Sequence, residues 1–192
     1  MLPKILVFAG SVRSGSFCAR LAARAVKEFL EAGAEVTWIS LTDYAMPIYD
    51  ADHEAKSGPP DGAQRLKRLM MGHEAVLIVT PEYNASIPPV LKNTLDWISR
   101  VRDRNESPLA AYRDRVFAVA AASDRDTGGL YALMALRQVL TVGCGALVIP
   151  EQLALARAGS AFDENDMLRD ERDRNQLSRV VQRLLETARE LT

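Results

Sequence analysis

The chain has 192 residues, 48% of them hydrophobic and 26% charged, a composition typical of a globular protein and not of a disordered one. Its 24 basic and 25 acidic residues nearly cancel, so charge gives no reason to expect nucleic acid or an anionic membrane as a partner. Two cysteines make neither a disulfide framework nor a metal-ligand pattern, which favours the cytoplasm. The first apolar run, residues 5–9, is too short for a signal peptide or a membrane span.

Apolar runs and helical patterns alternate along the chain, and no internal repeat or linker divides it. We expect strands at residues 5–9, 35–39, 75–79, 116–122 and 146–149. We expect helices at residues 16–33, 61–72, 90–101, 130–140 and 163–191. This alternation predicts an α/β fold in which a single domain, residues 1–192, contains a five-stranded parallel sheet with helices on both faces.

Several other features are interpreted as structural. Trp38 falls in the second strand and is expected in the core, whereas the charged segment 102–108 is expected to be solvated. The connection 43–60 is expected to be a long loop. His53 and His73 have no cysteine or carboxylate partner at ligand spacing, so we expect surface or capping roles for them and no metal site.

Three loops are candidates for ligand binding. In a parallel sheet of this kind, ligands bind beyond the carboxyl ends of the strands, where the strand order reverses. The loops that follow the first, third and fourth strands are residues 10–16, 81–89 and 123–129. They are rich in glycine, serine or proline, which sets them apart from the other connections.

The first loop reads GSVRSGS and joins a strand to the start of a helix, where free backbone N–H groups and the helix dipole attract anions. Its serine hydroxyls and Arg13 add donors for a phosphate monoester. Gly15 is followed by Ser16 instead of lysine, which excludes a Walker A loop. The absence of a second glycine two residues after Gly10 excludes a dinucleotide fingerprint. The alternative is that the serines only cap the turn and the helix.

The second loop reads PEYNASIPP, a polar run with one aromatic residue that three prolines make rigid. A rigid loop loses little entropy when it holds a ligand. Its amides, with Asn84 and Ser86, suit the heteroatom edge of a planar ring, and Tyr83 suits stacking or lining the pocket. The alternative is an ordinary proline-rich turn before the next helix. Glu82 lies beside this pocket, and the sequence leaves open whether it contacts the ligand or a neighbouring subunit.

These stretches resemble the NADPH-dependent FMN reductase family, which includes flavin-containing quinone, chromate and azo-compound reductases with a flavodoxin-like fold. The resemblance runs from residue 4 to about residue 149. It rests on GSVRSGS at 10–16, on PEYNASIP at 81–88 followed by LKNTLDW at 91–97, and on Ser123 with Gly128 and Gly129.

The resemblance implies a flavodoxin-like three-layer sandwich that binds FMN. The residues implied at the phosphate are Ser11, Arg13 and Ser16, with Phe17 and Cys18 beside them. Those implied around the ribityl chain and the isoalloxazine ring are Pro81, Glu82, Tyr83, Asn84, Ser86, Ser123, Gly128 and Gly129. Cys18 departs from the family, which usually has asparagine there, and a thiol is a weaker donor than an amide. One phosphate or capping contact is therefore expected to be missing, and Cys18 is expected to be an inert packed thiol.

The activity implied is transfer of two electrons from NADPH or NADH, through FMN, to a small acceptor such as a quinone, chromate, an azo compound or a flavin. Hydride transfer is the chemistry of the flavin, so no side chain is assigned as catalytic, and ping-pong kinetics are expected. The resemblance also implies a homodimer or homotetramer with the helix from Val90 near the interface. Two alternatives stay open: a flavodoxin-type electron carrier, which the near-neutral charge disfavours, and a non-enzymatic FMN-binding protein.

Overall fold

The computed structural model describes residues 2–191, and its centre is a sheet in the order β2-β1-β3-β4-β5. The strands are β1 (Lys4–Ala9), β2 (Glu35–Ile39), β3 (Ala75–Thr80), β4 (Val116–Ala122) and β5 (Leu147–Leu155). Every neighbouring pair is parallel. The predicted five-stranded parallel sheet is confirmed, and its strand order is that of the flavodoxin-like fold.

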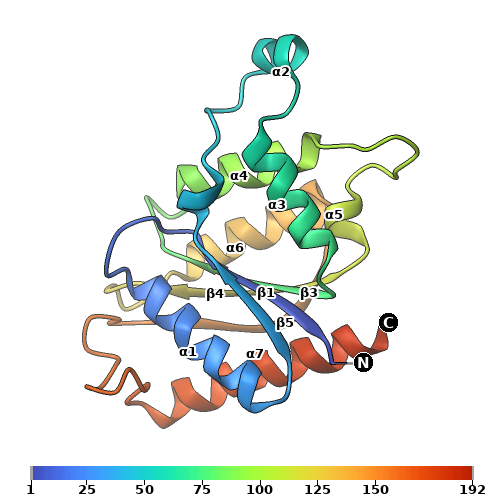
Figure 1. Cartoon of the computed structure of the whole chain (residues 1–192). Helices are drawn as coiled ribbons and strands as arrows, with labels where there is room; N and C mark the ends of the chain where they lie inside the picture. Colours follow the sequence, from blue (N-terminus) through green and yellow to red (C-terminus); the bar gives the residue numbers. More distant parts are fainter. Residues whose placement is uncertain (1, 192) are drawn as a thin grey trace.

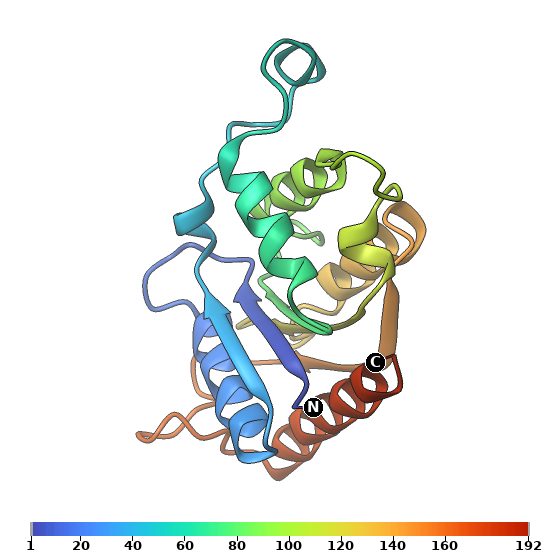
Figure 2. The same ribbon diagram turned by 45° about the vertical axis from the view of Figure 1, so that its right-hand side comes forward.

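Helices cover both faces of the sheet, which gives three layers (Figure 1 and Figure 2). One face carries α1 (Phe17–Glu31) and α7 (Glu171–Glu190). The other face carries α3 (Asp61–Met71), α4 (Pro89–Arg100), the short α5 (Ala110–Arg113) and α6 (Leu130–Gln138), which a π-helical turn, Val139–Gly143, extends. Within the described residues, no helix is both long and apolar enough to cross a membrane.

Alternation of side chains across each strand builds two cores. In β1, Ile5 and Val7 face α1 and α7, whereas Leu6 and Phe8 face the other helical layer, and all four are fully buried. The inner strands β1, β3 and β4 are covered on both faces, so both sets of alternating positions must be apolar. This is why the inner strands appear in the sequence as continuous apolar runs.

The fifth strand is longer than the predicted segment 146–149, because Pro150 does not end it. The pairing of β4 with β5 changes register near this proline, and the strand then continues to Leu155. Arg137 of α6 donates from Nη2 to the carbonyl oxygens of Ile149 (2.8 Å) and Pro150 (3.1 Å). These bonds supply donors to carbonyl groups at the irregularity, where regular pairing is interrupted.

The last helix begins at residue 171 and not at 163 as predicted. The carboxylate of Asp163 accepts the N–H groups of Asn165 and Met167, both at 2.9 Å, and so stabilises a turn instead of a helix. Asp170 is the N-cap of α7, because its Oδ1 accepts the N–H group of Arg172 at 2.7 Å.

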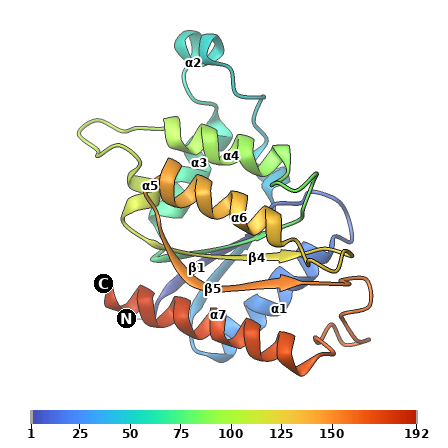
Figure 3. The same cartoon turned by 180° about the vertical axis from the view of Figure 1, so that it is seen from behind.

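The connection 43–60 is not only a loop, because it contains a short helix, α2 (Ala51–Ser57), and follows a 3₁₀ turn at Leu41–Tyr44. It projects from the body of the molecule beyond α3 and α4 (Figure 1 and Figure 3). At its base the buried Trp97 donates from Nε1 to the carbonyl oxygen of Pro47 at 2.7 Å. The projecting segment is therefore anchored to α4.

Two residues differ in burial from the sequence interpretation. Trp38 is 50% exposed instead of lying in the core, because β2 is an edge strand that the helical layers cover only in part. His73 is buried, and its ring nitrogens lie 2.7 Å from the carbonyl oxygen of Leu69 and 2.8 Å from Oγ1 of Thr37. His73 thus caps the end of α3, so the predicted capping role is correct and the alternative, a surface position, is not. His53 is exposed.

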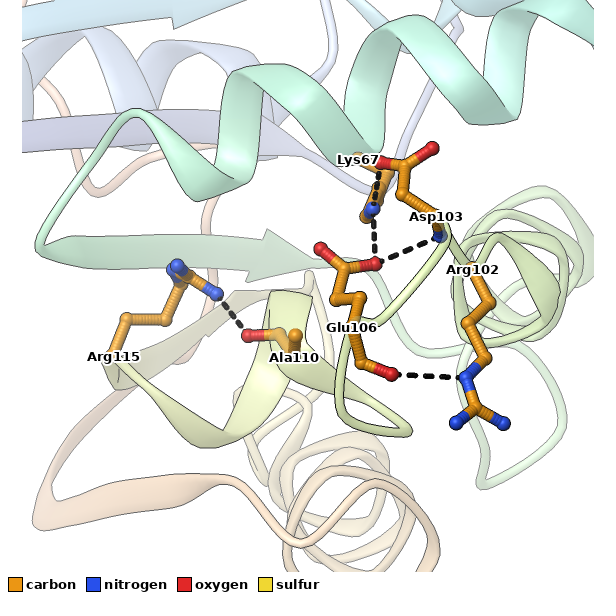
Figure 4. A network of polar contacts seen from close by, with 6 residues as sticks. All are labelled: Lys67, Arg102, Asp103, Glu106, Ala110 and Arg115. Carbon is orange, nitrogen blue, oxygen red and sulfur yellow. Dashed lines mark hydrogen bonds and ion pairs between the residues drawn. The ribbon is translucent and has the colours of Figure 1, made fainter.

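The segment 102–108 is solvated as predicted except at the half-buried Glu106, and through Asp103 and Glu106 it contacts α3 (Figure 4). The side chain of Lys67 is 1% exposed, and its Nζ lies 2.6 Å from Oδ2 of Asp103 and bonds Oε2 of Glu106. Arg102 donates from Nε to the carbonyl oxygen of Glu106 at 2.9 Å. A buried ammonium group requires such partners, because removing an unpaired charge from water is costly.

Candidate active site

The three loops selected from the sequence leave the sheet at one edge. Register pairs Ala9 with Val79 and Thr80 with Ala121, so β1, β3 and β4 end at nearly the same level. The strand order reverses between β1 and β3, which is where ligands bind in folds of this kind. We call these loops together the rim: residues 10–16, 81–88 and 123–129.

Ser16 starts α1 as its N-cap. Its Oγ accepts the N–H groups of Cys18 at 3.2 Å and Ala19 at 3.4 Å, and the residue is buried. The alternative that serine caps the helix is therefore correct for Ser16. Its hydroxyl hydrogen is still available as a donor toward the rim.

The backbone of the first loop offers an anion site. Within the described chain, the N–H groups of Val12, Ser14, Gly15 and Phe17 have no hydrogen-bond acceptor. They lie at the positive end of the 15-residue helix α1. Free amides at a helix start are a ready site for phosphate.

Arg13 is exposed beside these amides. Its Nη1 has one long contact, 3.4 Å to the carbonyl oxygen of Ser14, and its guanidinium carbon lies 5.8 Å from the centre of the Phe17 ring. No carboxylate of the described chain pairs with it. The charge of Arg13 is thus available to an anionic ligand. Ser11 is half-buried, and its Oγ accepts the N–H group of Arg13 at 3.4 Å.

The second loop is a tight turn and not an irregular lead-in to α4. Tyr83 and Ser86 exchange two backbone hydrogen bonds, of 2.9 and 3.0 Å. Asn84 and Ala85 between them both have positive φ, 50° and 60°, as the central pair of a type I′ turn requires. Asn84, Ser86 and Tyr83 are exposed on this rigid turn, while Pro81 is half-buried at its start.

Glu82 contacts its own chain. Its Oε2 accepts the N–H groups of Tyr131 (3.0 Å) and Ala132 (3.2 Å) at the start of α6. The N-cap position of α6 is Gly129, which has no side chain to do this. Glu82 therefore caps α6 and joins the second loop to the third, a favourable place for a negative charge.

The third loop approaches its neighbours too closely for any side chain on its glycines. A Cβ on Gly128 would lie 2.4 Å from the carbonyl oxygen of Ala154, and one on Gly129 would lie 2.7 Å from Cβ of Ala121. Both residues also have positive φ, +62° and +90°. Ser123, at the start of the loop, accepts the N–H group of Arg125 on its Oγ at 3.2 Å. Close packing on β4 and β5 therefore fixes the backbone of the third loop.

Cys18 does not join the rim. Its side chain is 1% exposed, and its Sγ lies 3.7 Å from the carbonyl oxygen of Ala122 at the end of β4. Burial raises the pKa of the Cys18 thiol to about 11. The expected packing of this thiol is confirmed. Cys144 is buried likewise, and burial raises its pKa to about 11 as well.

We expect both thiols to resist alkylation. At pH 8 a pKa of about 11 in place of 9.0 reduces the thiolate fraction about 100-fold, so iodoacetamide should label the folded protein at least that much more slowly than the unfolded chain. Because the folded pKa values are raised, the stability that they contribute is complete below pH 9 and is lost as the pH rises through 11. Rapid labelling of either native thiol would contradict the burial of these side chains.

A fourth segment, residues 156–160, also reaches the rim, and sequence reasoning missed it. Gly159 donates its N–H group to Oδ1 of Asp124 at 2.6 Å, and Arg157 donates from Nε to Oδ1 of Asp126 at 2.8 Å. Because the fifth strand was predicted to end before Pro150, the segment after its actual end at Leu155 was not placed beside the third loop. The actual strand carries this segment alongside the third loop.

The rim offers donors that fit the phosphate of FMN. The first loop places free amides and a free guanidinium together, which suits a phosphate dianion. The turn at Tyr83 and the third loop, whose glycines pack closely on β4 and β5, offer rigid surfaces for a planar ring. Among residues 2–191, no three His, Cys, Asp or Glu side chains converge as they would for a metal ion.

Comparison with known proteins identifies the family of this chain. The model of the NADPH-dependent FMN reductase family matches residues 3–160. A quinone reductase of Escherichia coli strain K12 is 36% identical over 138 residues, which are 71% of this chain and 69% of that protein. An NAD(P)H-dependent FMN reductase of Pseudomonas aeruginosa is 32% identical over 183 residues, 94% of this chain and 92% of that protein.

A solved structure supports the fold. FerB, a flavoenzyme NAD(P)H:(acceptor) oxidoreductase from Paracoccus denitrificans, matches with a TM-score of 0.79 at 24% identity, over 98% of both chains. The family match extends over most of the sequence and includes every loop of the rim. The chain therefore belongs to the NADPH-dependent FMN reductase family, and it is an FMN-dependent oxidoreductase that takes its electrons from NAD(P)H.

Proposed function

We propose that the rim holds FMN, with its phosphate in loop 10–16 and its ring between loops 81–88 and 123–129, and that the enzyme reduces quinones. One observation carries the placement of the cofactor. Loop 10–16 leaves β1 at the strand-order switch, four of its amides up to the start of α1 have no acceptor among the described residues, and it carries the unpaired guanidinium of Arg13.

The phosphate would be bound mainly by groups of loop 10–16 that have no partner among the described residues or can donate a further hydrogen bond. The free backbone amides of loop 10–16 would donate hydrogen bonds to the phosphate oxygens. The hydroxyls of Ser11 and Ser16 and the guanidinium of Arg13 would add charge-assisted hydrogen bonds. Phe17 would pack beside the ligand, because its ring is half-buried next to Arg13. Cys18 is left out of this set, since its amide bonds Ser16 and its thiol lies in the core.

The ring would be positioned by two rigid surfaces. Pro81, Tyr83, Asn84 and Ser86 would contact it from the second loop, the turn of which is closed by two backbone bonds. Ser123, Gly128 and Gly129 would border it from the third loop, whose backbone is held against β4 and β5 by the close packing of its two glycines. Glu82 would act indirectly, by holding these two loops together through α6.

Bound FMN supplies the hydride chemistry, so the protein needs no catalytic acid or base of its own. Its residues bind the cofactor, orient it and leave one side of the ring open. The two histidines of the chain play no part, because His73 is bonded to Leu69 and Thr37 and His53 lies on the projecting α2. This arrangement implies that nicotinamide and acceptor use the same place in turn.

A quinone is the acceptor that the similarity to the Escherichia coli quinone reductase favours. A flavodoxin-type carrier would hold a flavin that nicotinamide does not reduce. The relative from Pseudomonas aeruginosa is instead named an NAD(P)H-dependent reductase. An enzyme with two small-molecule substrates is therefore favoured over a carrier that exchanges electrons with proteins.

The proposal includes a homodimer or homotetramer in the cytoplasm. A groove of about 470 Å³ between α4 and the end of α6 is lined largely by apolar side chains, among them Ile87 and Val139. Nearby, Val142 is 81% exposed and Met134 is 61% exposed, which is unusual for apolar side chains on a free surface. The two unpaired thiols suit a reducing compartment.

We expect Arg13→Ala to weaken FMN binding much more than it changes the chemistry. Loss of a charge-assisted bond to phosphate should raise the FMN dissociation constant about 10- to 100-fold, while kcat at saturating FMN stays within about threefold. Fluorescence titration with FMN and steady-state assay in excess FMN measure the two quantities.

The matched control is Arg20→Ala, which removes a half-buried arginine of α1 whose guanidinium is already held by Asp166 and the ring of Phe162. It should leave the FMN dissociation constant within about twofold. An Arg13→Ala enzyme that excess FMN does not restore, or equal losses of affinity in both variants, would argue against the proposed phosphate site.

A further inference from the structure

A second cavity opens beside the ring position of the rim. Its volume is about 380 Å³, and it lies between the loops that follow β3 and β4. Its lining is almost entirely polar or aromatic: Glu82, Asp124, Arg125, Asp126, Thr127 and Tyr131. We call it the Arg125 cavity. It shares Glu82 and the loop 123–129 with the rim, so a molecule in it would be next to the proposed ring.

The three carboxylates of the Arg125 cavity already have partners. Glu82 accepts two N–H groups at the positive end of α6. Asp126 pairs with Arg157 at 2.8 Å, and Asp124 accepts the N–H group of Gly159 at 2.6 Å. Each of these carboxylates therefore has a hydrogen-bond partner other than Arg125.

Arg125 is the exception in this cavity. It follows Asp124 and precedes Asp126, yet within the described residues its guanidinium forms no ion pair and no hydrogen bond. Its backbone is held in place, because its N–H group bonds Oγ of Ser123 at 3.2 Å. A guanidinium with five unused donors on a fixed backbone suits a planar or tetrahedral oxyanion.

Two further side chains indicate the rest of the ligand. Tyr131 is 50% exposed and lines the cavity, so its ring is available for stacking. Thr127 adds a hydroxyl group on the exposed side. An aromatic surface and a free cation next to the site of electron transfer together match a ring that carries a negative charge.

We propose that the Arg125 cavity selects the acceptor, and that it favours quinones with an anionic substituent such as a sulfonate, a carboxylate or an ionised hydroxyl. Arg125 pairs with the substituent while Tyr131 stacks on the ring. Arg125 acts in binding only, because the electrons come from NAD(P)H through the established activity. This inference rests on the proposed position of the cofactor, since the cavity selects acceptors only if the ring is beside it.

The test compares two quinones that differ by one sulfonate group, 1,4-naphthoquinone and 1,4-naphthoquinone-2-sulfonate, with FMN-loaded enzyme. Arg125→Gln should raise KM for the sulfonate about tenfold, leave KM for the neutral quinone within about twofold and leave kcat unchanged. Arg125→Lys should retain part of the preference, because it keeps the charge. Arg104→Gln, an exposed arginine of the loop after α4, removes one charge elsewhere and should not change the ratio of the two KM values.

A binding measurement gives a readout that does not depend on turnover. Calorimetric titration of the oxidised, FMN-loaded protein with 2-naphthalenesulfonate should give a dissociation constant about tenfold higher for Arg125→Gln than for the wild type, and no change for Arg104→Gln. Unchanged binding in Arg125→Gln would overturn the proposal. So would a raised KM for NADPH with unchanged selectivity between the quinones, because the arginine would then bind the nicotinamide dinucleotide.

Failure of the proposed quinone reduction can be distinguished from failure of the proposed role of Arg125. A wild-type protein that takes up FMN but reduces neither quinone would contradict quinone reduction, whatever the state of this cavity. The naphthalenesulfonate titration would still decide whether Arg125 binds an aromatic anion, with tenfold weaker binding in Arg125→Gln for the proposal and equal binding against it.

Discussion

Replacing Gly128 with alanine should destabilise the protein by about 3 kcal/mol or more and weaken FMN binding at least about tenfold. The new Cβ would lie 2.4 Å from the carbonyl oxygen of Ala154, which belongs to the backbone of β5 and cannot swing aside. The positive φ of +62° adds strain for any residue with a side chain. For a chain of this length the melting temperature should fall by about 6–12 °C.

Gly33→Ala is the matched control for this prediction. Gly33 also has a positive φ, +79°, but a Cβ there would meet nothing within 4 Å, and it lies in the turn before β2. It should therefore cost only the conformational strain, about 1 kcal/mol, and leave FMN binding unchanged. Thermal unfolding and FMN titration of both variants measure the difference. Equal destabilisation would mean that loop 123–129 does not pack as tightly on β5 as described.

Lys67→Met should lower the free energy of unfolding by about 3 kcal/mol, because it leaves Glu106, with 14% of its side chain exposed, without its counter-charge. Burial by itself lowers the pKa of Lys67, but hydrogen bonds to Asp103 and Glu106 outweigh it and raise the pKa. The hydrogen bond from Lys67 lowers the pKa of Glu106. Urea unfolding measures the loss, and the double variant Lys67→Met with Glu106→Met should recover part of it.

The pH dependence of this loss has a definite sign. Because the folded pKa of Glu106 is lowered, its contribution is complete above its unfolded value of about 4.3 and is lost as the pH falls through the folded value. The difference between wild type and Lys67→Met should thus be constant near neutral pH and shrink in acid. Lys92→Met, which removes an exposed pair with Asp96, should cost less than about 0.5 kcal/mol. A Lys67→Met variant no less stable than Lys92→Met would contradict the buried pair.

Local patterns were sufficient to predict the sheet, its helical layers and the loops of the site. The inner strands are apolar at every position because helices cover both of their faces, and no partner information is needed to recognise them. The loops 10–16 and 81–88 carry residue types that a simple turn does not require. Their positions at the carboxyl ends of strands then follow from the parallel topology.

Features that depend on tertiary partners could not be predicted in this way. The continuation of β5 past Pro150 relies on Arg137, thirteen residues earlier in the sequence. The exposure of Trp38 depends on β2 being an edge strand, which its own sequence does not reveal. The capping role of Glu82 depends on the start of α6, 49 residues away. The late start of α7 has a local cause, because the carboxylate of Asp163 stabilises a turn in place of the first predicted helical turn.

The central claim is that the rim binds FMN and that NAD(P)H reduces it there. The most direct measurement is to saturate the purified protein with FMN, remove the free cofactor by dialysis, and follow the visible flavin absorbance after anaerobic addition of NADPH or NADH. We expect one FMN to be retained per chain, to be bleached by nicotinamide within the time of turnover, and to regain its colour on addition of 1,4-naphthoquinone. A dialysed protein without flavin absorbance, or a bound flavin that neither nicotinamide bleaches, would contradict it.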